Sequence, residues 1–331
     1  MNRVYQRVVL LMRKLTLILA SICLIVFALA GCTPQNAATT GGKSAGTGKV
    51  FCEVTDELGR KVVLEKKPER VVVLSPSLLT FVDAVGGKVV GRPSARVGEI
   101  PPSMESAPEV GHVFNVNIEK VVSLKPDLVI MNANQHEKFL KILESNHIQA
   151  IALQPKTYEQ VKKDLKLLGS VYGNEAGAEK KVKAMDDQIA QIKAKMPEGK
   201  KRIAIIHATP SNVTVELGSS IAGSCADMLG FTNVAEGSAA IEGKPDKTPY
   251  SMEALVEKNP EIIFITSMGE ADRIEKRLKA DVKSNPAWNS LEAVRKGKVF
   301  VLPEKLFLLN PGLDFPEAVK FMAKAVYPEA F

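Results

Sequence analysis

Four histidines and four cysteines carry most of the reactive side-chain chemistry in this 331-residue chain. The histidines, His112, His136, His147 and His207, stand far apart, and no histidine or cysteine group has the spacing of a zinc site. The chain also lacks a Walker nucleotide loop and the His-Glu-x-x-His metal motif. These residues therefore predict a protein that is not an enzyme and holds no intrinsic cofactor.

The first 31 residues have the composition of a secretory signal. Four basic residues within the first 14 precede a mostly apolar run of 16 residues from Leu15 to Ala30. As a helix, this run covers about 24 Å, which is less than the roughly 30 Å hydrocarbon core of a bilayer. The sequence predicts a signal peptide over residues 1–31, with an uncleaved membrane anchor as the alternative.

The signal ends in Leu29-Ala30-Gly31-Cys32, which resembles the lipobox of bacterial lipoproteins. The resemblance implies that the Cys32 thiol is acylated and that cleavage makes Cys32 the first residue. Two or three acyl chains hold a protein firmly at a membrane surface, whereas one chain alone is marginal. The stretch at 32–49 is small, polar and glycine-rich, which predicts a flexible tether between the lipid anchor and the folded body.

The net charge of +7 depends partly on the signal, which holds four of the 44 basic residues and none of the 37 acidic residues. The remaining chain is close to charge balance. Aromatic residues make up only 5% of the sequence, with one tryptophan, Trp288. Neither a basic patch nor an aromatic stacking surface is left to indicate nucleic-acid binding.

An internal duplication organises the body of the chain. Residues 117–130 align without gaps on residues 251–264. Each copy begins with a helix-capping residue, Asn117 or Ser251, and carries an acid in the first helical turn, where it complements the helix dipole. Each helix stops before a proline and leads into a buried apolar strand.

The elements around the duplication predict an α/β fold. Helical patterns alternate with short apolar runs, which indicates parallel sheets. Apolar residues at helical spacing predict one long amphipathic helix between the halves, with a coiled-coil segment as the alternative. Further strands are predicted at 89–90, 148–153 and 299–302. The predicted domains are an N-terminal lobe at 50–173, the connecting helix at 174–197 and a C-terminal lobe at 198–331.

The order of these features resembles the substrate-binding proteins that serve ABC importers of iron complexes, haem and vitamin B12. The matching motifs are Val54-Thr-Asp-Glu-Leu-Gly-Arg60, Lys125-Pro-Asp-Leu-Val129 and Asn285-Pro-Ala-Trp-Asn-Ser-Leu-Glu-Ala-Val294. The resemblance covers about residues 50–331, and the stretch at 304–319 is most similar to the haem-receptor branch. It implies the class III periplasmic-binding-protein fold, in which two Rossmann-like lobes with parallel sheets are joined by a single long α-helix.

The resemblance places the ligand in the cleft between the lobes, at the carboxyl ends of the strands, where open α/β sheets bind their ligands. The ligand-binding residues on this map are Ser75, His112, Phe114, Asn132, Tyr250, Met268 and Phe307. In the haem branch each lobe supplies one axial iron ligand, and His112 and Met268 take those two places. Imidazole nitrogen and thioether sulfur are both established haem ligands. This arrangement would reverse the usual assignment of ligands to lobes.

The resemblance also implies the partners. One acid on each lobe of these receptors pairs with arginines of the membrane permease, and Glu119 and Glu253 match those acids. The permease dimer would work with separate ATPase subunits. The protein is expected to be a monomeric receptor, lipid-anchored at the extracytoplasmic face of the cell membrane.

The cargo stays open between haem, a ferric siderophore and cobalamin. Cobalamin would be held by shape and aromatic contact, whereas an anionic siderophore would need arginines, for which Arg92 and Arg96 are candidates. His136 follows a predicted strand and is a further cleft candidate, while His147 and His207 are expected to be structural. Outside transport, an exported chelatase-like enzyme and a surface sensor are the alternatives.

Overall fold

The first half of the described chain contains a three-stranded parallel sheet. Its order is β3 (Val71–Val73), β7 (Leu128–Asn132) and β8 (Gln149–Leu153). Apolar side chains from both faces of this sheet are buried, so the strands read as continuous apolar runs. The computed structural model describes residues 50–95, 100–308 and 310–331, so the predicted signal, Cys32, the tether and Arg96 lie outside it.

Two small antiparallel pairings flank this first sheet. One is the hairpin of β1 (Cys52–Thr55) and β2 (Lys61–Leu64). The other joins β5 (Glu109–His112) to β6 (Asn115–Val116), and β5 also pairs in parallel with β4 (Arg92–Ser94). The strand predicted at residues 89–90 is wrong, because Val90 makes only a single backbone bond to Val71 and regular pairing begins at β4.

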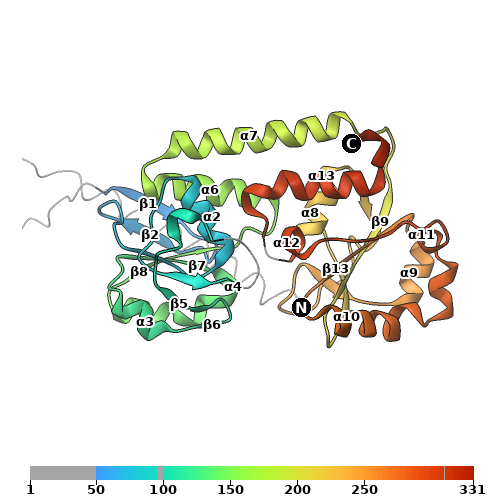
Figure 1. The fold of residues 1–331 in the computed structure, drawn as a ribbon, viewed down its shortest axis with the longest axis horizontal. Coiled ribbons are helices and arrows are strands. Elements are labelled where there is room, and N and C mark those ends of the chain that lie inside the picture. The colour runs from blue at the N-terminus through green and yellow to red at the C-terminus, as the bar shows by residue number, and fades with distance from the viewer. Residues whose placement is uncertain (1–49, 96–99, 309) are drawn as a thin grey trace, which may run out of the picture. The chain divides into compact units, whose positions relative to one another are not determined.

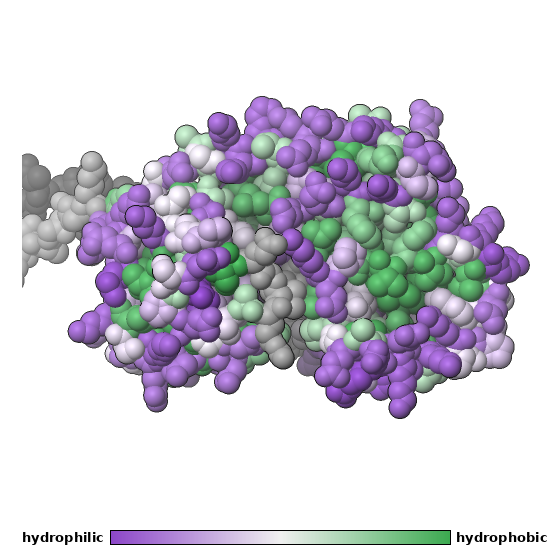
Figure 2. Space-filling model, in the orientation of Figure 1, coloured by the Kyte–Doolittle hydropathy of each residue, from purple (hydrophilic) through white to green (hydrophobic). Residues whose placement is uncertain are grey.

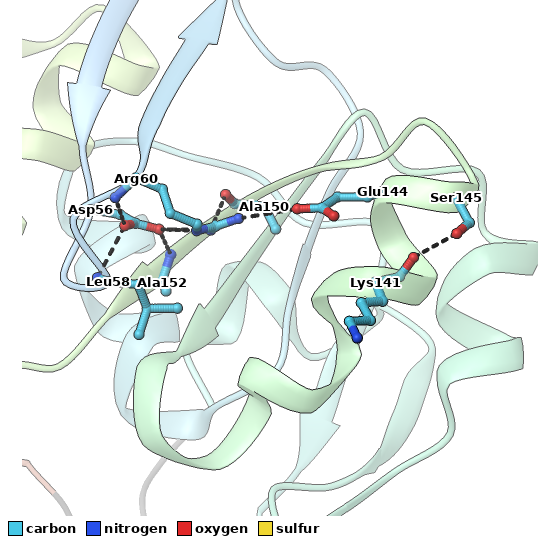
Figure 3. A network of polar contacts seen from close by, with 8 residues as sticks. All are labelled: Asp56, Leu58, Arg60, Lys141, Glu144, Ser145, Ala150 and Ala152. Atoms are coloured by element: carbon cyan, nitrogen blue, oxygen red, sulfur yellow. Dashed lines mark hydrogen bonds and ion pairs between the residues drawn. The ribbon is translucent and has the colours of Figure 1, made fainter.

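The first hairpin is fixed to the sheet by a buried ion pair (Figure 3). The Asp56 carboxylate accepts hydrogen bonds from the backbone nitrogens of Leu58, Arg60 and Ala152 and from the Arg60 guanidinium, at 2.7–3.2 Å. The same guanidinium donates to the carbonyl of Ala150 at 2.9 Å. Asp56 therefore both closes the hairpin turn and joins the hairpin to β8. These contacts explain why the Thr-Asp-Glu-Leu-Gly-Arg motif contains an aspartate and an arginine four residues apart.

A mixed sheet forms the second half. Its order is β12 (Lys247–Pro249), β10 (Val213–Glu216), β9 (Arg202–Ala208), β13 (Ile262–Ser267) and β14 (Val299–Val301), with β11 (Thr232–Asn233) pairing β9 separately. The duplication appears in three dimensions, because β9 pairs with β13 in parallel just as β3 pairs with β7. The predicted α/β class with parallel sheets is confirmed.

Helices cover both sheets and connect their strands (Figure 1). The α-helices near the first sheet are α2 (Pro76–Ala84), α3 (Ile118–Ser123), α4 (Ala133–His136), α5 (Leu140–Ser145) and α6 (Tyr158–Tyr172). Those that follow are α7 (Glu175–Ala194), α8 (Ile221–Met228), α9 (Met252–Lys258), α10 (Ala271–Leu278), α11 (Glu292–Arg295), α12 (Glu304–Phe307) and α13 (Phe315–Val326). In the described ranges, no helix has the length and apolar character needed to cross a bilayer.

The long helix α7 is the predicted connector. Its buried stripe of Val182, Met185, Ile189 and Ile192 packs toward α6 and α13, while Figure 2 shows a mostly hydrophilic surface along its outer side. The helix spans 20 residues, or about 30 Å, and ends three residues before Pro197. The helical region is disfavoured for the residue before a proline, so the connector is shorter than the predicted segment.

Candidate functional site

The carboxyl edge of the first sheet carries two of the predicted ligand-binding residues. Ser75 follows β3 and begins α2, and its buried hydroxyl lies 3.1 Å from the hydroxyl of Ser77. Asn132 ends β7, and its side-chain oxygen accepts from the backbone nitrogens of Asn134 and Gln135. Because β3 and β7 are adjacent parallel strands, both residues lie at one edge, and much of their hydrogen-bonding capacity is used locally.

The half-buried His112, at the end of β5, and the exposed Phe114, in the turn before β6, form a ring pair. Their ring centroids are 5.6 Å apart, and the Phe114 side chain is 60% exposed. Gly111 permits the turn, since it has a φ of +106° and a Cβ there would meet the Asn115 carbonyl oxygen at 2.5 Å. The Phe114 backbone nitrogen donates a long bond of 3.4 Å to Nδ1 of His112. Both rings are thus available to a ligand.

Met268 lies at the carboxyl edge of the second sheet, directly after β13. Its backbone nitrogen bonds to the carbonyl of Ala208 at 3.0 Å, while its side chain is 42% exposed. The next residue, Gly269, has a φ of +129° and packs so closely on Pro210 that a Cβ would approach that ring to 2.9 Å. The backbone holds Met268 in place and leaves its thioether accessible.

Tyr250 is half-buried and Phe307 is buried. The Tyr250 hydroxyl lies 3.8 Å from the sulfur of Met252, and burial, with a smaller effect of Asp281, raises the Tyr250 pKa to about 12. Phe307 is only 5% exposed and packs edge-on against Phe321 at 6.4 Å. Ligand contact through either side chain stays a prediction.

A buried polar network occupies the same edge of the second sheet. Nδ1 of His207 lies 2.9 Å from the hydroxyl of Thr266 and 3.2 Å from a carboxylate oxygen of Glu216. Thr266 donates to that oxygen at 2.6 Å, and the ammonium of Lys247 lies 4.0 Å away. Burial raises the Glu216 pKa, but the bond from His207 and the charge of Lys247 outweigh it and hold the pKa below its usual range.

This network was not predicted, because His207 was expected to be structural. The available signal was its place: it stands at the end of an apolar strand, where β9 is followed by Thr209-Pro210-Ser211. Two residues earlier on the same face, Ile205 is part of the core. At the end of the strand, an imidazole ring takes the place where the next apolar core side chain is expected. This replacement indicates that the apolar core gives way to a polar site at the carboxyl edge.

His136 and Arg92, two further candidates, have local structural partners. Nδ1 of the buried His136 accepts from the Asn132 nitrogen at 3.1 Å, so the proton is on Nε2, which lies 2.8 Å from the Val113 carbonyl. Arg92 donates to Glu109 and to the carbonyls of Glu105 and Pro93. Neither side chain is left free for a ligand by these contacts.

Glu119 and Glu253 occupy equivalent exposed places on α3 and α9. The predicted caps are confirmed: Asn117 accepts from the Lys120 nitrogen at 2.9 Å and Ser251 from the Ala254 nitrogen at 3.2 Å. Neither glutamate makes an ion pair with any residue that the structure describes. Both carboxylates are therefore free to meet an external cation.

The two acid-bearing helices are held by a duplicated arginine contact. Arg70 donates to the Leu124 carbonyl at 2.6 Å, just beyond α3, and Arg202 donates to the Lys258 carbonyl at 2.8 Å, at the end of α9. A cation at the end of a helix satisfies its last carbonyls and complements its dipole. Equivalent contacts thus fix both helices to the sheets.

A groove lies beside Glu253 in the second copy. It has a volume of about 740 Å³. Its lining residues are Tyr250, Ser251, Met252, Glu253, Val256, Glu257, Asn285 and Ala287. Elsewhere in the described residues, no group of three or more histidine, cysteine, aspartate or glutamate side chains is placed to hold a metal ion. Both described cysteines, Cys52 and Cys225, are free thiols.

These features place exposed side chains and two duplicated acidic helices on an α/β fold with two main sheets. The family profile described as periplasmic binding protein matches residues 71–306, and the chain belongs to this family. The chain is thus a substrate-binding receptor of the ABC-importer class, which works with permease and ATPase components.

Individual relatives support this class over almost the whole chain. An uncharacterised ABC transporter substrate-binding lipoprotein of Bacillus subtilis, YvrC, is 27% identical over 330 residues, covering 97% of this chain and 99% of the relative. The Fe(3+)-citrate-binding protein YfmC of Bacillus subtilis is 27% identical over 322 residues, covering 95% and 98%. The structure of S. aureus IsdE complexed with heme shares the fold, with a TM-score of 0.69 at 20% identity over 78% of this chain and 98% of that chain.

Proposed function

We propose that the protein is a lipid-anchored extracytoplasmic receptor that captures haem and delivers it to the permease of an ABC importer. Cargo would lie at the carboxyl edges of the two sheets, the usual binding place in open α/β folds. The observation that carries the proposal is the exposed Phe114 ring beside the half-buried His112 at the end of β5, together with the exposed Met268 at the carboxyl edge of the second sheet. A flat, largely apolar porphyrin needs aromatic and thioether surface together with a nitrogen or sulfur ligand for its iron.

Arg92, the described arginine predicted for an anionic ferric siderophore, is already bonded to Glu109 and two backbone carbonyls, so this residue does not favour that cargo. Similarity to the ferric-citrate-binding protein YfmC keeps ferric citrate as the second candidate. Cobalamin, held by shape and aromatic contact, is the third.

Docking through Glu119 and Glu253 is the second part of the proposal. The two exposed carboxylates lie on duplicated helices and have no ion-pair partner among the described residues. Each would meet an arginine of the permease, and two such contacts would fix the orientation of the receptor and speed the encounter more than they add affinity. The groove beside Glu253 would add surface to the second contact.

A titration with candidate chelates tests the cargo. The purified protein receives haemin, ferric citrate, a ferric siderophore or cobalamin, and absorbance and the fluorescence of the buried Trp288 are recorded. We expect a saturable Soret change with haemin that alters in His112→Ala or Met268→Ala. Saturable binding of ferric citrate without any haemin response would reject haem and keep the receptor class, while turnover of a chelate would favour a chelatase-like enzyme.

A further inference from the structure

The hydrogen bonds around His207 fix which ring nitrogen carries the proton. The Thr266 hydroxyl donates its only hydrogen to Glu216 at 2.6 Å, so toward His207 it can act only as an acceptor. The Glu216 carboxylate is also an acceptor. Nδ1 of His207 lies within 3.2 Å of both oxygens, so Nδ1 must carry the hydrogen, and in the neutral ring the lone pair is on Nε2.

This Nε2 has no hydrogen-bond partner among the residues that the structure describes. The Nδ1 side of the ring is covered, since the Glu216 side chain is 6% exposed and Thr266 is buried. The His207 side chain nevertheless keeps 11% of its surface exposed, which therefore lies on the side away from these partners. The lone pair of Nε2 is thus left without a local role.

The register of the strands places this nitrogen at the carboxyl edge. His207 pairs with Thr266 on β13 and with Thr214 on β10, one residue before the end of β9. The next residue, Ala208, is the one whose carbonyl holds the backbone of Met268. His207 therefore stands beside the proposed cargo position rather than deep in the sheet.

We infer that His207, rather than Met268, supplies the metal-binding atom of the second sheet and presents Nε2 to the iron of the cargo. This inference rests on the proposed function and deepens it. A histidine that binds a metal through one nitrogen commonly donates the other to a carboxylate, which fixes the ring and makes it more basic. Glu216 does this for His207, and Thr266 assists as a positioning residue.

The comparison with His112 supports the assignment. Nδ1 of His112 accepts from the Phe114 nitrogen, so its neutral form carries the hydrogen on Nε2 and would have to exchange tautomers to bind iron through that atom. His207 needs no such change.

The cargo that His207 could bind in this way is an iron chelate with an exchangeable coordination position, such as haem. A chelate whose six iron positions are already filled could not accept the Nε2 atom.

Haemin titration of point variants tests this inference. We expect His207→Gln to lose the spectrum of a nitrogen-ligated iron and to weaken haemin binding by at least about tenfold. Glu216→Gln should keep the nitrogen-ligated spectrum while weakening binding by about 10–100-fold, as losses of such carboxylate partners do. The exposed His147, replaced by asparagine, is the matched control and should leave both readouts unchanged.

A second variant keeps the test independent of any folding defect at a buried strand position. His112→Ala with Met268→Ala changes only partly or largely exposed side chains, and we expect this double variant to bind haemin more weakly but to retain one nitrogen ligand. Loss of all nitrogen ligation in it, or a wild-type spectrum in His207→Gln, would overturn the assignment to His207. Ferrioxamine B, a saturated chelate, should show no dependence on His207. Failure of the wild-type protein to bind any chelate would instead refute the proposed receptor function.

Discussion

The carboxylate of Glu216 lies 3.2 Å from Nδ1 of His207, although His207 stands one residue before the end of β9 and Glu216 is further from that edge on the antiparallel β10. Lys247, 4.0 Å from the same carboxylate, balances its charge, although burial lowers the Lys247 pKa. A buried carboxylate is costly unless it is paired and hydrogen-bonded. The network is therefore stable only as a unit, and within it Nε2 of His207 has no hydrogen-bond partner among the described residues.

Charge reversal at the two docking acids should separate transport from binding. We expect Glu119→Arg with Glu253→Arg to abolish uptake of iron or haem in cells that lack the native receptor, because like charges would face the permease arginines. Haemin affinity of the purified variant should be unchanged, since both side chains are exposed on helices outside the cargo edges. The matched control is Asp187→Arg with Glu198→Arg, two exposed acids on and just beyond α7. Normal uptake by the first variant would exclude docking through these residues.

Replacement of Cys32 by serine should detach the protein from the membrane. The thiol is the proposed acylation point, and a serine at this place cannot form the thioether. Cell fractionation and intact mass should show an unacylated protein in the soluble fraction or as a precursor, whereas Cys225→Ser, at a buried free thiol, should leave the membrane fraction unchanged. An unaltered mass and membrane fraction for Cys32→Ser would contradict lipid anchoring.

Removal of the Asp56 carboxylate should destabilise the described fold strongly. Asp56→Ala leaves the Arg60 guanidinium and three backbone nitrogens without their acceptor, and breaking a buried ion pair costs about 3–5 kcal/mol. Urea denaturation measures the change. The exposed pair of Glu53 and Lys61 on the same hairpin offers the control, and Glu53→Gln should have a much smaller effect. Equal effects of the two substitutions would argue against the role of the Asp56 network.

The stability of the protein should fall as the pH rises toward 8. Asp164 on α6 is fully buried, and its carboxylate oxygens have no hydrogen-bond partner among the described residues. Burial, and secondarily the charge of Glu57, raises the pKa of Asp164 to about 8. The folded state thus holds a proton that the unfolded chain releases at its lower, ordinary pKa, so this stability is complete below that ordinary pKa and is lost as pH rises through about 8.

Asp164→Asn should remove this pH dependence, because asparagine does not titrate. Each pH unit between the two pKa values corresponds to at most about 1.4 kcal/mol, and the urea midpoints at pH 5.5 and 8.5 give the slope. Asp187→Asn, an exposed substitution on α7, should keep the wild-type slope. A wild-type slope in Asp164→Asn would show that another group controls the stability in this range.

Local signals in the sequence predicted the duplicated helix-strand units well. The caps Asn117 and Ser251, the prolines after the helices and the apolar strands are short-range features, and each acts on its own few residues. The predicted end of the connecting helix was less accurate, because helix propensity and the approaching Pro197 compete over the last few residues.

Residues whose role depends on distant partners were harder to predict. His207 and Thr266 are 59 residues apart, and their contact exists only because β9 and β13 are neighbours in a particular register. The packing of Phe307 against Phe321 likewise depends on how α12 meets α13, and its predicted ligand contact stays a prediction. A residue type at a strand end can indicate a site, whereas the direction of its side chain requires the structure.

Haemin titration of the purified wild-type protein, followed in the Soret region, tests the central claim most directly. The account predicts saturation at one haemin per protein, the spectrum of a nitrogen-ligated iron and quenching of Trp288. Absence of a saturable change with haemin would contradict haem as the cargo, and absence of any change with ferric citrate, a ferric siderophore and cobalamin as well would contradict the receptor function.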